Sequence, residues 1–253
     1  ILTSWNALMI SAFARVAKVT DNKDYGGIAI KAGKFILSTM FDGKRLLRRY
    51  RDGDAGINAY LVDYAQLAVA CLDLYEYTYN VFWFSQAKDL MKIVDQLFFN
   101  EDGPYYDTAN NSEDLIIKML VGNDGVEPSG NTAAALAFLK LSNYEVDSNY
   151  EDNTQRILSG FRQHLSQAGV SYSAMLTVQH FMISNPKQVI IIGAKDSDDT
   201  KRLLTVVRTG FYPNIVVAFS DPEDLEKNQE VLPFLKDKTM VNGNSTAYVC
   251  YNK

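Results

Sequence analysis

Residues 48–64 read RRYRDGDAGINAYLVDY and connect two long segments in which apolar residues recur at helical spacing. The stretch gathers charged and aromatic side chains around Gly53 and Gly56, which is typical of a loop at the mouth of a helix. Loops held by a rigid scaffold commonly carry binding residues. The sequence therefore predicts a site for a small polar ligand here, in a mainly helical protein.

Two helices are expected before this stretch. The first follows Ser4, which can cap it, and carries apolar residues at i, i+3, i+4, i+7, i+8 and i+11. This face is expected to be buried and consists of Trp5, Leu8, Met9, Ala12, Phe13 and Val16. The second helix begins at Asp24 and ends at the turn Asp42-Gly43. Its expected buried side consists of Ile28, Ala32, Phe35, Ile36 and Met40.

Further helices are expected after the stretch. Apolar periodicity predicts them at approximately 58–79, 81–99, 129–144, 150–165 and 172–183. A second long connection, residues 100–128, contains the turn dipeptides Asp102-Gly103 and Asp124-Gly125 and favours a short strand at 104–106. The helices therefore alternate with two loop excursions.

The character of the sequence changes after Pro186. Residues 189–192 and 215–219 are continuous β-branched and apolar runs, which is typical of strands buried on both faces. A helix expected at 200–209 separates them, so the order predicts a right-handed parallel βαβ unit. Residues 248–250 favour a third strand.

Together these elements predict a mainly α fold with antiparallel helix pairs and a small C-terminal βαβ appendage. Residues 1–185 are expected to form part of an α/α toroid with loop excursions at 43–57 and 100–128, and residues 186–253 a βαβ subdomain packed on it. The helix starts are too irregularly spaced for a solenoid of ~34-residue repeats. The helices are also too few to close a ring, so an open arc is expected.

Composition narrows the possible functions. A net charge of -5 argues against a general nucleic-acid surface, and no apolar run approaches the ~18 residues of a membrane span. Two cysteines, Cys71 and Cys250, and two distant histidines, His164 and His180, predict no metal and no other cofactor. The sparse cysteines favour a reduced, cytoplasmic setting. Because the chain begins at Ile1 rather than at Met, it is expected to be a fragment.

Four phrases carry a resemblance to a known family. They are ILTSWNALMISAFA (1–14), RYRDGDAGINAYLVDYAQL (49–67), EPSGNTAAAL (127–136) and TAYVC (246–250). In this order they resemble the proteins related to spermatogenesis-associated protein twenty and bacterial YyaL. That family joins an N-terminal thioredoxin-like domain to a six-hairpin, glycosidase-like α/α toroid.

The resemblance implies that this chain is the C-terminal part of the toroid plus the βαβ piece. It also implies a thioredoxin-like domain, absent from this chain, as a partner. The family has no firmly assigned reaction. Its fold is similar to that of N-acylglucosamine epimerases and of relatives that hydrolyse or bind sugars, and this is an analogy of fold only.

Asp63 and Asp52 are the candidate catalytic carboxylates. Glycoside hydrolysis needs one carboxylic acid near the leaving oxygen and a second carboxylate as base or nucleophile. Asp52 and Asp54 lie two residues apart, so on an extended chain they share a face. The alternative for this pair is a polar turn. The alternative for Asp63 is a carboxylate that stabilises the N-terminus of its own helix.

Candidate ligand-binding residues surround these carboxylates. Each also has an ordinary structural alternative: pairing with aspartates for the arginines, the core for Trp5, and an N-cap for the Ser129 region. Arginines suit a uronate or phosphate, aromatic rings suit a sugar face, and helix starts offer free N–H groups. The candidates are Trp5, Asn6, Arg49, Arg51, Tyr60, Tyr64, Ser129 and Asn131.

Two functional hypotheses follow. The first is a carbohydrate-processing domain, glycosidase-like or epimerase-like, acting through Asp63 or Asp52. The second is a non-catalytic module that binds a ligand or a protein, while another domain performs any chemistry. A helical scaffold is weaker, because the polar residues concentrate in the excursions. The site hypothesis requires Trp5, Asp63 and Asn131 to converge on one hollow.

Overall fold

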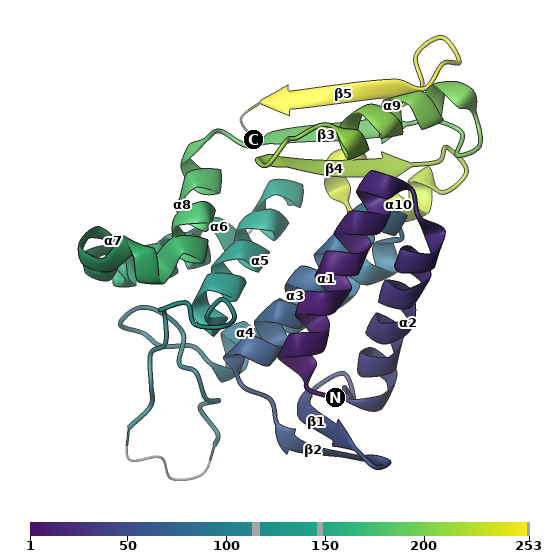
Figure 1. Ribbon diagram of the computed structural model, residues 1–253. Coiled ribbons are helices and arrows are strands. Elements are labelled where there is room, and N and C mark those ends of the chain that lie inside the picture. Colours follow the sequence, from purple (N-terminus) through teal and green to yellow (C-terminus); the bar gives the residue numbers. More distant parts are fainter. Residues whose placement is uncertain (113–116, 146–148, 252–253) are drawn as a thin grey trace.

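The computed structural model describes residues 1–112, 117–145 and 149–251. Helix pairs stand side by side in a layer, a three-stranded sheet lies across one end of it, and a hairpin and a long loop project from the other end (Figure 1). The predicted mainly helical fold is confirmed, because strands occupy only two small sheets within these ranges.

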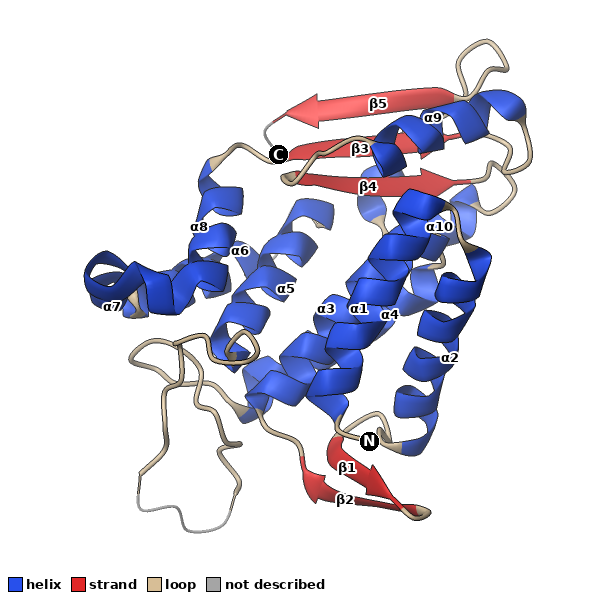
Figure 2. Ribbon diagram, viewed as in Figure 1, coloured by secondary structure: helices blue, strands red, loops and turns tan. Residues whose placement is uncertain are grey.

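The helix layer is built from pairs that follow one another along the chain. They are α1 (Thr3–Thr20) with α2 (Lys23–Thr39), α3 (Leu61–Thr78) with α4 (Val81–Leu97), and α5 (Gly130–Tyr144) with α6 (Tyr150–Gly160). α3 lies between α1 and α5 and also packs on α4, so it is buried around almost its whole circumference (Figure 2). The connections into α3 and α5 carry the hairpin and the long loop, which places both at the same end.

The helix predicted at 150–165 is divided in the structure. α6 ends at Gly160, and α7 (Arg162–Ala168) and the 3-10 turn η1 (Gly169–Tyr172) lead to α8 (Ser173–Ile183), which packs on α5. Phe161 lies at the break, buried against Tyr172 with 6.1 Å between the ring centroids. Apolar periodicity continues through Leu165, so it gave no sign of this break.

The core is aromatic where α3, α4 and α5 meet. The ring of Tyr75 makes edge contacts with Phe84 and Tyr144, each at 5.5 Å between centroids. Phe84 and Tyr144 also meet each other at 5.2 Å. Burying a ring of this size contributes about 1.5–3 kcal/mol, and edge-to-face pairs add about 0.5–1.5 kcal/mol.

A buried ion cluster joins α1, α3 and α5. Lys140 of α5 places its Nζ 2.9 Å from a carboxylate oxygen of Asp73 and 2.9 Å from one of Glu76, both on α3. From α1, Arg15 pairs with Asp73 at 2.9 Å and Lys18 with Glu76 at 3.0 Å. The cluster therefore fixes the positions of the three neighbouring helices.

A β-hairpin replaces the predicted start of the third helix. β1 (Leu47–Arg51) pairs antiparallel with β2 (Asp54–Asn58) through the two-residue turn Asp52-Gly53, whose φ values are 51° and 85°. Two positive φ values are the geometry of a type I′ turn, which Asp-Gly favours. The helix start predicted at residue 58 is wrong, because the chain first returns as β2.

Gly53→Ala is expected to lower the free energy of unfolding by about 1–2 kcal/mol, because a Cβ at this positive φ meets the neighbouring carbonyl. Urea unfolding would measure the change. Gly27→Ala is the matched control, since Gly27 lies in α2 and an added Cβ there meets nothing within 4 Å. The control should be neutral or stabilising by up to about 1 kcal/mol. Equal effects at both positions would contradict the turn assignment.

The C-terminal sheet has the order β4-β3-β5. Its strands and the helices that connect them are β3 (Lys187–Ile192), α9 (Asp198–Thr209), β4 (Ile215–Ser220), α10 (Leu225–Val231), the 3-10 turn η2 (Pro233–Leu235) and β5 (Thr246–Tyr251). β3 and β4 pair in parallel, with Val189 opposite Val217, and β5 pairs antiparallel with β3. The predicted parallel strands, the helix between them and the third strand are confirmed; α10 was not predicted.

The sheet packs on the C-terminal ends of α3 and α5. Tyr144 donates its hydroxyl hydrogen bond to the carbonyl of Val217 at 3.2 Å, and Gln188 donates to the carbonyl of Asn143 at 2.7 Å. The ring of Tyr79 lies 5.4 Å from that of Phe219. The sheet therefore closes the end of the helix layer opposite the hairpin (Figure 1).

α1 exposes the face that the sequence predicts to be buried. Trp5, Met9 and Val16 are 57%, 53% and 44% exposed. The helix instead buries a side of mostly small residues: Thr3, Ser4, Ala7, Ile10, Ala14 and Ala17. Small side chains allow close approach of α2 and α3, and periodicity alone favoured the larger side chains on the opposite face. The prediction for this face is wrong, as it is for Ile28 of α2, which is half exposed.

Candidate functional site

The starts of α1, α3 and α5 come together at one end of the helix layer, with β1–β2 and the connection 98–129. We call this region the loop end (Figure 1). The backbone N–H of Ser4 donates to the Asp63 carboxylate at 3.1 Å. A Cβ at Gly130 would lie 2.9 Å from the backbone nitrogen of Val62, so α5 begins directly against α3. The predicted convergence of the three helix starts is therefore present in the backbone.

Asp63 connects two of these helix starts. Its carboxylate accepts the N–H of Tyr60 at 3.0 Å and completes a capping box at the N-terminus of α3, while its other oxygen accepts from Ser4. Arg48 of β1 pairs with it at 2.9 Å. Burial raises the pKa of Asp63, although the N–H groups and Arg48 oppose the shift. The side chain is fully buried, so its geometry does not support the predicted role of a catalytic acid that faces a pocket.

Asp52 lies at the tip of the hairpin. It occupies the first turn position and pairs with Arg51 at 3.1 Å, while Asp54 pairs with Arg49 at 2.9 Å. Both aspartates are exposed, and exposed pairs of this kind contribute at most about 1 kcal/mol. The turn-and-pairing alternative is thus confirmed for these residues, and the catalytic prediction for Asp52 is not supported by its geometry.

Asn131, Ser129 and Tyr64 are buried and engaged within the protein. The Asn131 side chain accepts from the N–H of Tyr105 and donates to the carbonyls of Tyr105 and Val121, each at 2.9 Å. Ser129 caps α5 by accepting from the N–H of Thr132 at 3.1 Å.

The hydroxyl of Tyr64 likewise accepts from the N–H of Leu46 at 2.8 Å. The side chains of Tyr64, Ser129 and Asn131 hold the loops in place, and the contacts predicted between these residues and a ligand stay predictions. Residues 104–106, where a strand was expected, run as irregular chain against Asn131. Trp5, Asp63 and Asn131 accordingly share one end of the layer but not one hollow.

Trp5, Asn6, Tyr60 and Arg48 remain accessible at the loop end. Tyr60 is 37% exposed, and the guanidinium carbon of Arg48 lies 4.7 Å from the centre of its ring. Trp5 follows Ser4, so it stands one residue from the contact with Asp63. Asn6 is half-buried and donates to the carbonyl of Leu2 at 2.8 Å. A fixed cation and the ring of Tyr60 therefore lie beside the buried carboxylate.

Asp107 is a residue that the sequence analysis did not single out. Its carbonyl accepts the N–H of Leu61 at 3.0 Å, and its N–H donates to Met119 at 2.9 Å. Burial raises the pKa of its carboxyl group, Arg48 lowers it, and Asp63 raises it again, which leaves it above the usual value. Asp107 directly follows the tyrosines Tyr105 and Tyr106, but no spacing in the sequence connects it to residue 48.

We call Arg48, Tyr60, Asp63 and Asp107 the Arg48 cluster. Asp63 fixes the arginine, Tyr60 presents a partly exposed ring, and Asp107 supplies a half-buried carboxyl group that is easier to protonate than an ordinary aspartate. Hydrogen-bond donors, an acceptor and an aromatic ring in one place suit a polyhydroxylated or anionic small molecule.

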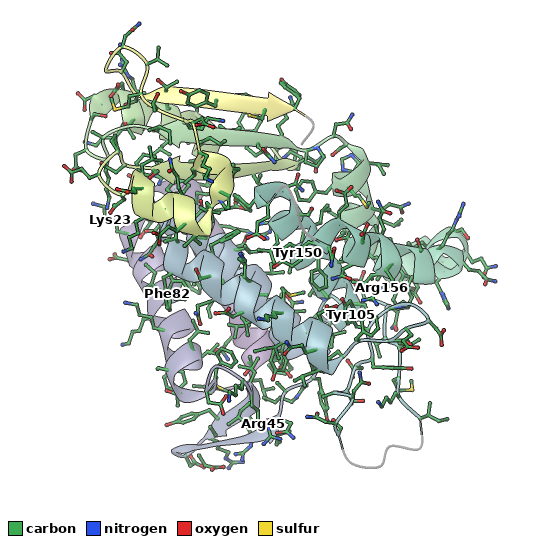
Figure 3. All side chains as sticks on the ribbon, turned by 180° about the vertical axis from the view of Figure 1, so that it is seen from behind. Lys23, Arg45, Phe82, Tyr105, Tyr150 and Arg156 are labelled. Carbon is green, nitrogen blue, oxygen red and sulfur yellow. The ribbon has the colours of Figure 1, made fainter. Side chains whose placement is uncertain are left out.

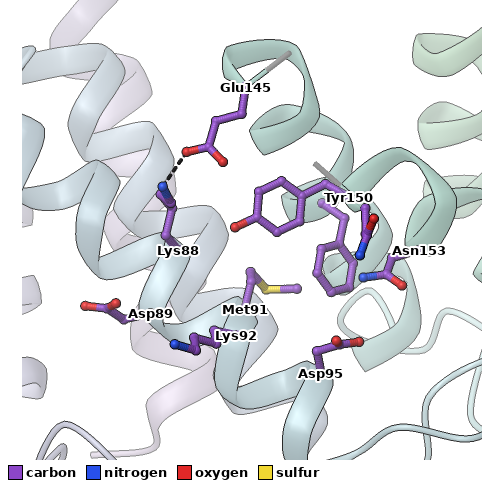
Figure 4. A pocket seen from close by; sticks show the side chains of 10 residues that line it. Lys88, Asp89, Met91, Lys92, Asp95, Glu145, Tyr150 and Asn153 are labelled. Carbon is purple, nitrogen blue, oxygen red and sulfur yellow. Dashed lines mark ion pairs between the residues drawn. The ribbon is translucent and has the colours of Figure 1, made fainter. Parts of the chain in front are cut away.

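A cavity of about 420 Å³ lies elsewhere, between α4 and the α5–α6 pair (Figure 4). Figure 3 shows Tyr150, one of its lining residues, from the back of the molecule. Phe138 and Tyr150 stack at 5.8 Å between centroids and form an aromatic wall, and Lys88 pairs with Glu145 at the rim. Burial raises the pKa of Tyr150 to about 12. The remaining lining residues are Asp89, Met91, Lys92, Asp95, Asn149 and Asn153.

Among the residues that the structure describes there is neither a group of metal-ligating side chains nor a helix suited to crossing a membrane. Within residues 1–112, 117–145 and 149–251, no three or more histidine, cysteine, aspartate or glutamate side chains gather in a group that could hold a metal ion. In the same ranges, none of the helices combines the length and the apolar character required to cross a membrane. Cys71 is buried, which raises the pKa of its thiol well above the usual value.

Comparison with known proteins places the chain among its relatives. No family model matches it. It is 28% identical over 264 residues to Spermatogenesis-associated protein 20 from Homo sapiens and 29% identical over 264 residues to the protein of that name from Rattus norvegicus. Both alignments cover 100% of the chain. This chain resembles spermatogenesis-associated protein 20 along its whole length. The resemblance predicted from the four sequence phrases is therefore confirmed.

The similarity to spermatogenesis-associated protein 20 includes both the helix layer and the C-terminal sheet, because the alignment leaves no part of the chain uncovered. An uncharacterised protein from Caenorhabditis elegans is 25% identical over 259 residues, or 98% of the chain. The chain spans about a third of the length of these relatives: 34% of the human and rat proteins and 35% of the nematode protein.

Proposed function

We propose that this chain binds a carbohydrate at the loop end, through the Arg48 cluster. The observation that carries the proposal is the arrangement around Arg48, where a guanidinium fixed by Asp63 lies against the ring of Tyr60. The chain at Asp107 reaches the same helix start, because its carbonyl accepts the N–H of Leu61 at 3.0 Å, and burial raises the pKa of its carboxyl group. Perturbed carboxyl groups beside charged partners gather at functional sites. The fold analogy of the relatives with sugar-active toroids supports the same ligand class.

Each accessible group has a separate task in this proposal. The ring of Tyr60 would cover the C–H face of a sugar. Arg48 would donate to ring or hydroxyl oxygens, or to a uronate carboxylate, because its guanidinium has N–H groups beyond the one directed to Asp63. Asp107 would accept from a hydroxyl when ionised and donate to an oxygen when protonated.

We favour binding without turnover. Hydrolysis requires a second carboxylate about 5–10 Å from the first, on the other side of the scissile bond. The carboxylate nearest to this role, Asp63, is buried in its capping box, and Asp52 and Asp54 are paired at the hairpin tip. The alternative is a glycosidase-like or epimerase-like activity with Asp107 as the acid.

The helix pairs are also proposed to form an arc of an α/α toroid. Successive pairs contact one another through α1, α3 and α5, and both long connections emerge at the loop end, which supports this arrangement. The division of the chain at residues 185–186, a thioredoxin-like partner domain and a cytoplasmic location stay predictions.

Tyr60→Ala is expected to weaken sugar binding about tenfold, because it removes the ring that packs on the sugar and supports Arg48. Binding would be found by screening a panel of neutral sugars and uronates by thermal shift and measured by titration calorimetry. Asp107→Asn should weaken binding of the same sugar and shift its pH dependence. Asp54→Asn, at the exposed hairpin tip, is the control and should bind as the unmodified chain does.

The outcomes separate the alternatives. Turnover of the bound sugar that disappears in Asp107→Asn, with folding intact, would favour catalysis over binding. Sugar binding that survives Tyr60→Ala but fails in Asn153→Ala would place the ligand in the α4–α6 cavity and contradict the proposed site. The absence of binding by every sugar in the panel would overturn the carbohydrate proposal.

A further inference from the structure

The α4–α6 cavity is the strongest unassigned feature of this protein. α5 packs against both α4 and α6, and the cavity of about 420 Å³ lies where these two helices stand apart over Phe138 (Figure 4). A volume of this size holds a small organic molecule. The cavity is separate from the Arg48 cluster, since the two have no residue in common.

The aromatic side of the cavity is held in place by stacking. Phe138 lies between Tyr105 and Tyr150, with ring centroids 5.7 Å and 5.8 Å apart and interplanar angles of 29° and 30°. Tyr105 is fully buried and donates its hydroxyl hydrogen bond to Asp95 at 2.6 Å. Met91, which is also fully buried, completes the apolar floor. Side chains fixed in this way lose little freedom when an apolar group packs on them, which favours binding.

The α4 side of the cavity is polar, although it faces a neighbouring helix. The residues that α4 turns to the cavity recur at i, i+3, i+4 and i+7 and therefore lie on one face: Lys88, Met91, Lys92 and Asp95. Lys88 pairs with Glu145 at the rim. Among the residues that the structure describes, none forms an ion pair or a hydrogen bond with the ammonium of Lys92. This lysine is therefore available to an anionic group of a ligand.

Acceptors lie on the other side of the same cavity. Asp95, whose side chain is 47% exposed, accepts from Tyr105 through Oδ1, and Arg156 stands 3.9 Å from that oxygen. Within the described part of the chain, Oδ2 of Asp95 and the side-chain amide of Asn153 have no partner. Figure 4 shows Asp95 and Asn153 on one side of Met91, while Lys92 extends to the other side. A carboxylate oxygen and an amide oxygen suit an ammonium group.

We propose that the α4–α6 cavity binds a zwitterionic α-amino acid with an apolar side chain. Its carboxylate would bind Lys92, and its ammonium group would bind Asp95 and Asn153. Its side chain would pack on the ring of Tyr150, over the floor formed by Met91. A simple acid would bring a like charge to Asp95, and a simple amine would bring one to Lys92, so a ligand with both charges fits best.

Tyr150 can also contribute a hydrogen bond. Burial raises its pKa to about 12, so the hydroxyl stays protonated at neutral pH and can donate to the ligand carboxylate. Figure 4 shows this hydroxyl pointing across the cavity towards α4. The proposal depends only on residues of the α4–α6 cavity and does not require a carbohydrate ligand at the loop end.

Titration calorimetry with L-phenylalanine and L-leucine would test the proposal. We expect the unmodified chain to bind at least one of them, and Lys92→Met and Asn153→Ala to bind it at least about tenfold more weakly. Lys31→Met, at an exposed position of α2, is the control for the loss of a lysine and should bind as the unmodified chain does. Urea unfolding of each variant would show that its fold is intact.

Two analogues of phenylalanine identify the charges that are recognised. Phenylpropionate lacks the ammonium group and phenylethylamine lacks the carboxylate, so each should bind at least about tenfold more weakly than the amino acid. Equal binding of either analogue would overturn the proposal. Amino-acid binding that is unchanged in Lys92→Met, or no binding at up to about 10 mM ligand, would overturn it as well. Tyr60→Ala should leave amino-acid binding unchanged, which separates this result from that of the sugar screen.

Discussion

Lys140→Met is expected to lower the free energy of unfolding by about 3 kcal/mol. Removing one partner of a buried ion pair costs about 3–5 kcal/mol, because the other charge stays buried without compensation. Here the ammonium serves Asp73 and Glu76 together. The lower end of the range applies, since Arg15 still pairs with Asp73 and Lys18 still pairs with Glu76.

Urea unfolding at neutral pH measures the loss in Lys140→Met. Lys34→Met, an exposed position on α2, is the control and is expected to change stability by less than about 0.5 kcal/mol. A loss below about 1 kcal/mol in Lys140→Met would show that α1 alone neutralises the two acids.

The pH dependence of the same two proteins provides an independent measurement. Burial raises the pKa of Asp73, but Lys140 and Arg15 together hold it well below the usual range, and the pKa of Glu76 is also lowered. Their stabilisation is therefore present above the unfolded pKa values, about 4, and is lost as the pH falls below them. In Lys140→Met the effect of burial on the pKa values of the two acids exceeds that of the remaining cations. The free energy of unfolding of this variant should therefore rise as the pH is lowered from 7 to 5, whereas that of the unmodified chain should stay level.

Asn131→Ala is expected to cost about 3 kcal/mol. The substitution leaves three backbone groups without this partner: the buried N–H and carbonyl of Tyr105 and the partly buried carbonyl of Val121. Each unsatisfied buried group costs about 1–3 kcal/mol, and some of that is recovered if the loop relaxes. Hydrogen exchange at Tyr105 should accelerate with the loss of global stability.

Asn110→Ala is the matched control for Asn131→Ala. Asn110 lies on the same connection, is exposed, and donates to the carbonyl of Phe99 at 2.8 Å. Water can replace that hydrogen bond, so the expected loss is below about 1 kcal/mol. Similar losses at both positions would indicate that Asn131 is no more important than an ordinary loop residue.

The sequence identified most helices and the parallel strands because their periodicity is long and regular. The prediction failed where one sequence pattern is compatible with two different structures. On α1, one face has large apolar residues and the opposite face has alanines, and packing against two neighbours selected the alanines. Residues 52–53 were identified as a turn, but the strand after them is short and follows no alternating apolar pattern.

The sequence predicted that the starts of three helices gather at one end of the layer, but it did not predict which side chains there are engaged within the protein. Asp63 and Asn131 look like ligand-binding groups in the sequence, since polar residues at helix starts serve ligands and caps alike. Only the fold shows that they bind backbone groups from distant segments. Asp107 was missed for the converse reason: its position at the start of α3 depends on the hydrogen bond between its carbonyl and the N–H of Leu61, which no local spacing indicates.

The buried ion cluster has a consequence for the order in which the chain matures during synthesis. Arg15 precedes Asp73 by 58 residues, so one cation is already available when α3 emerges. Lys140 follows Asp73 by 67 residues, and until it arrives the two acids of α3 face water on that side. We therefore expect α1 and α3 to associate first and α5 to pack on them next. The sheet is expected to dock after both steps.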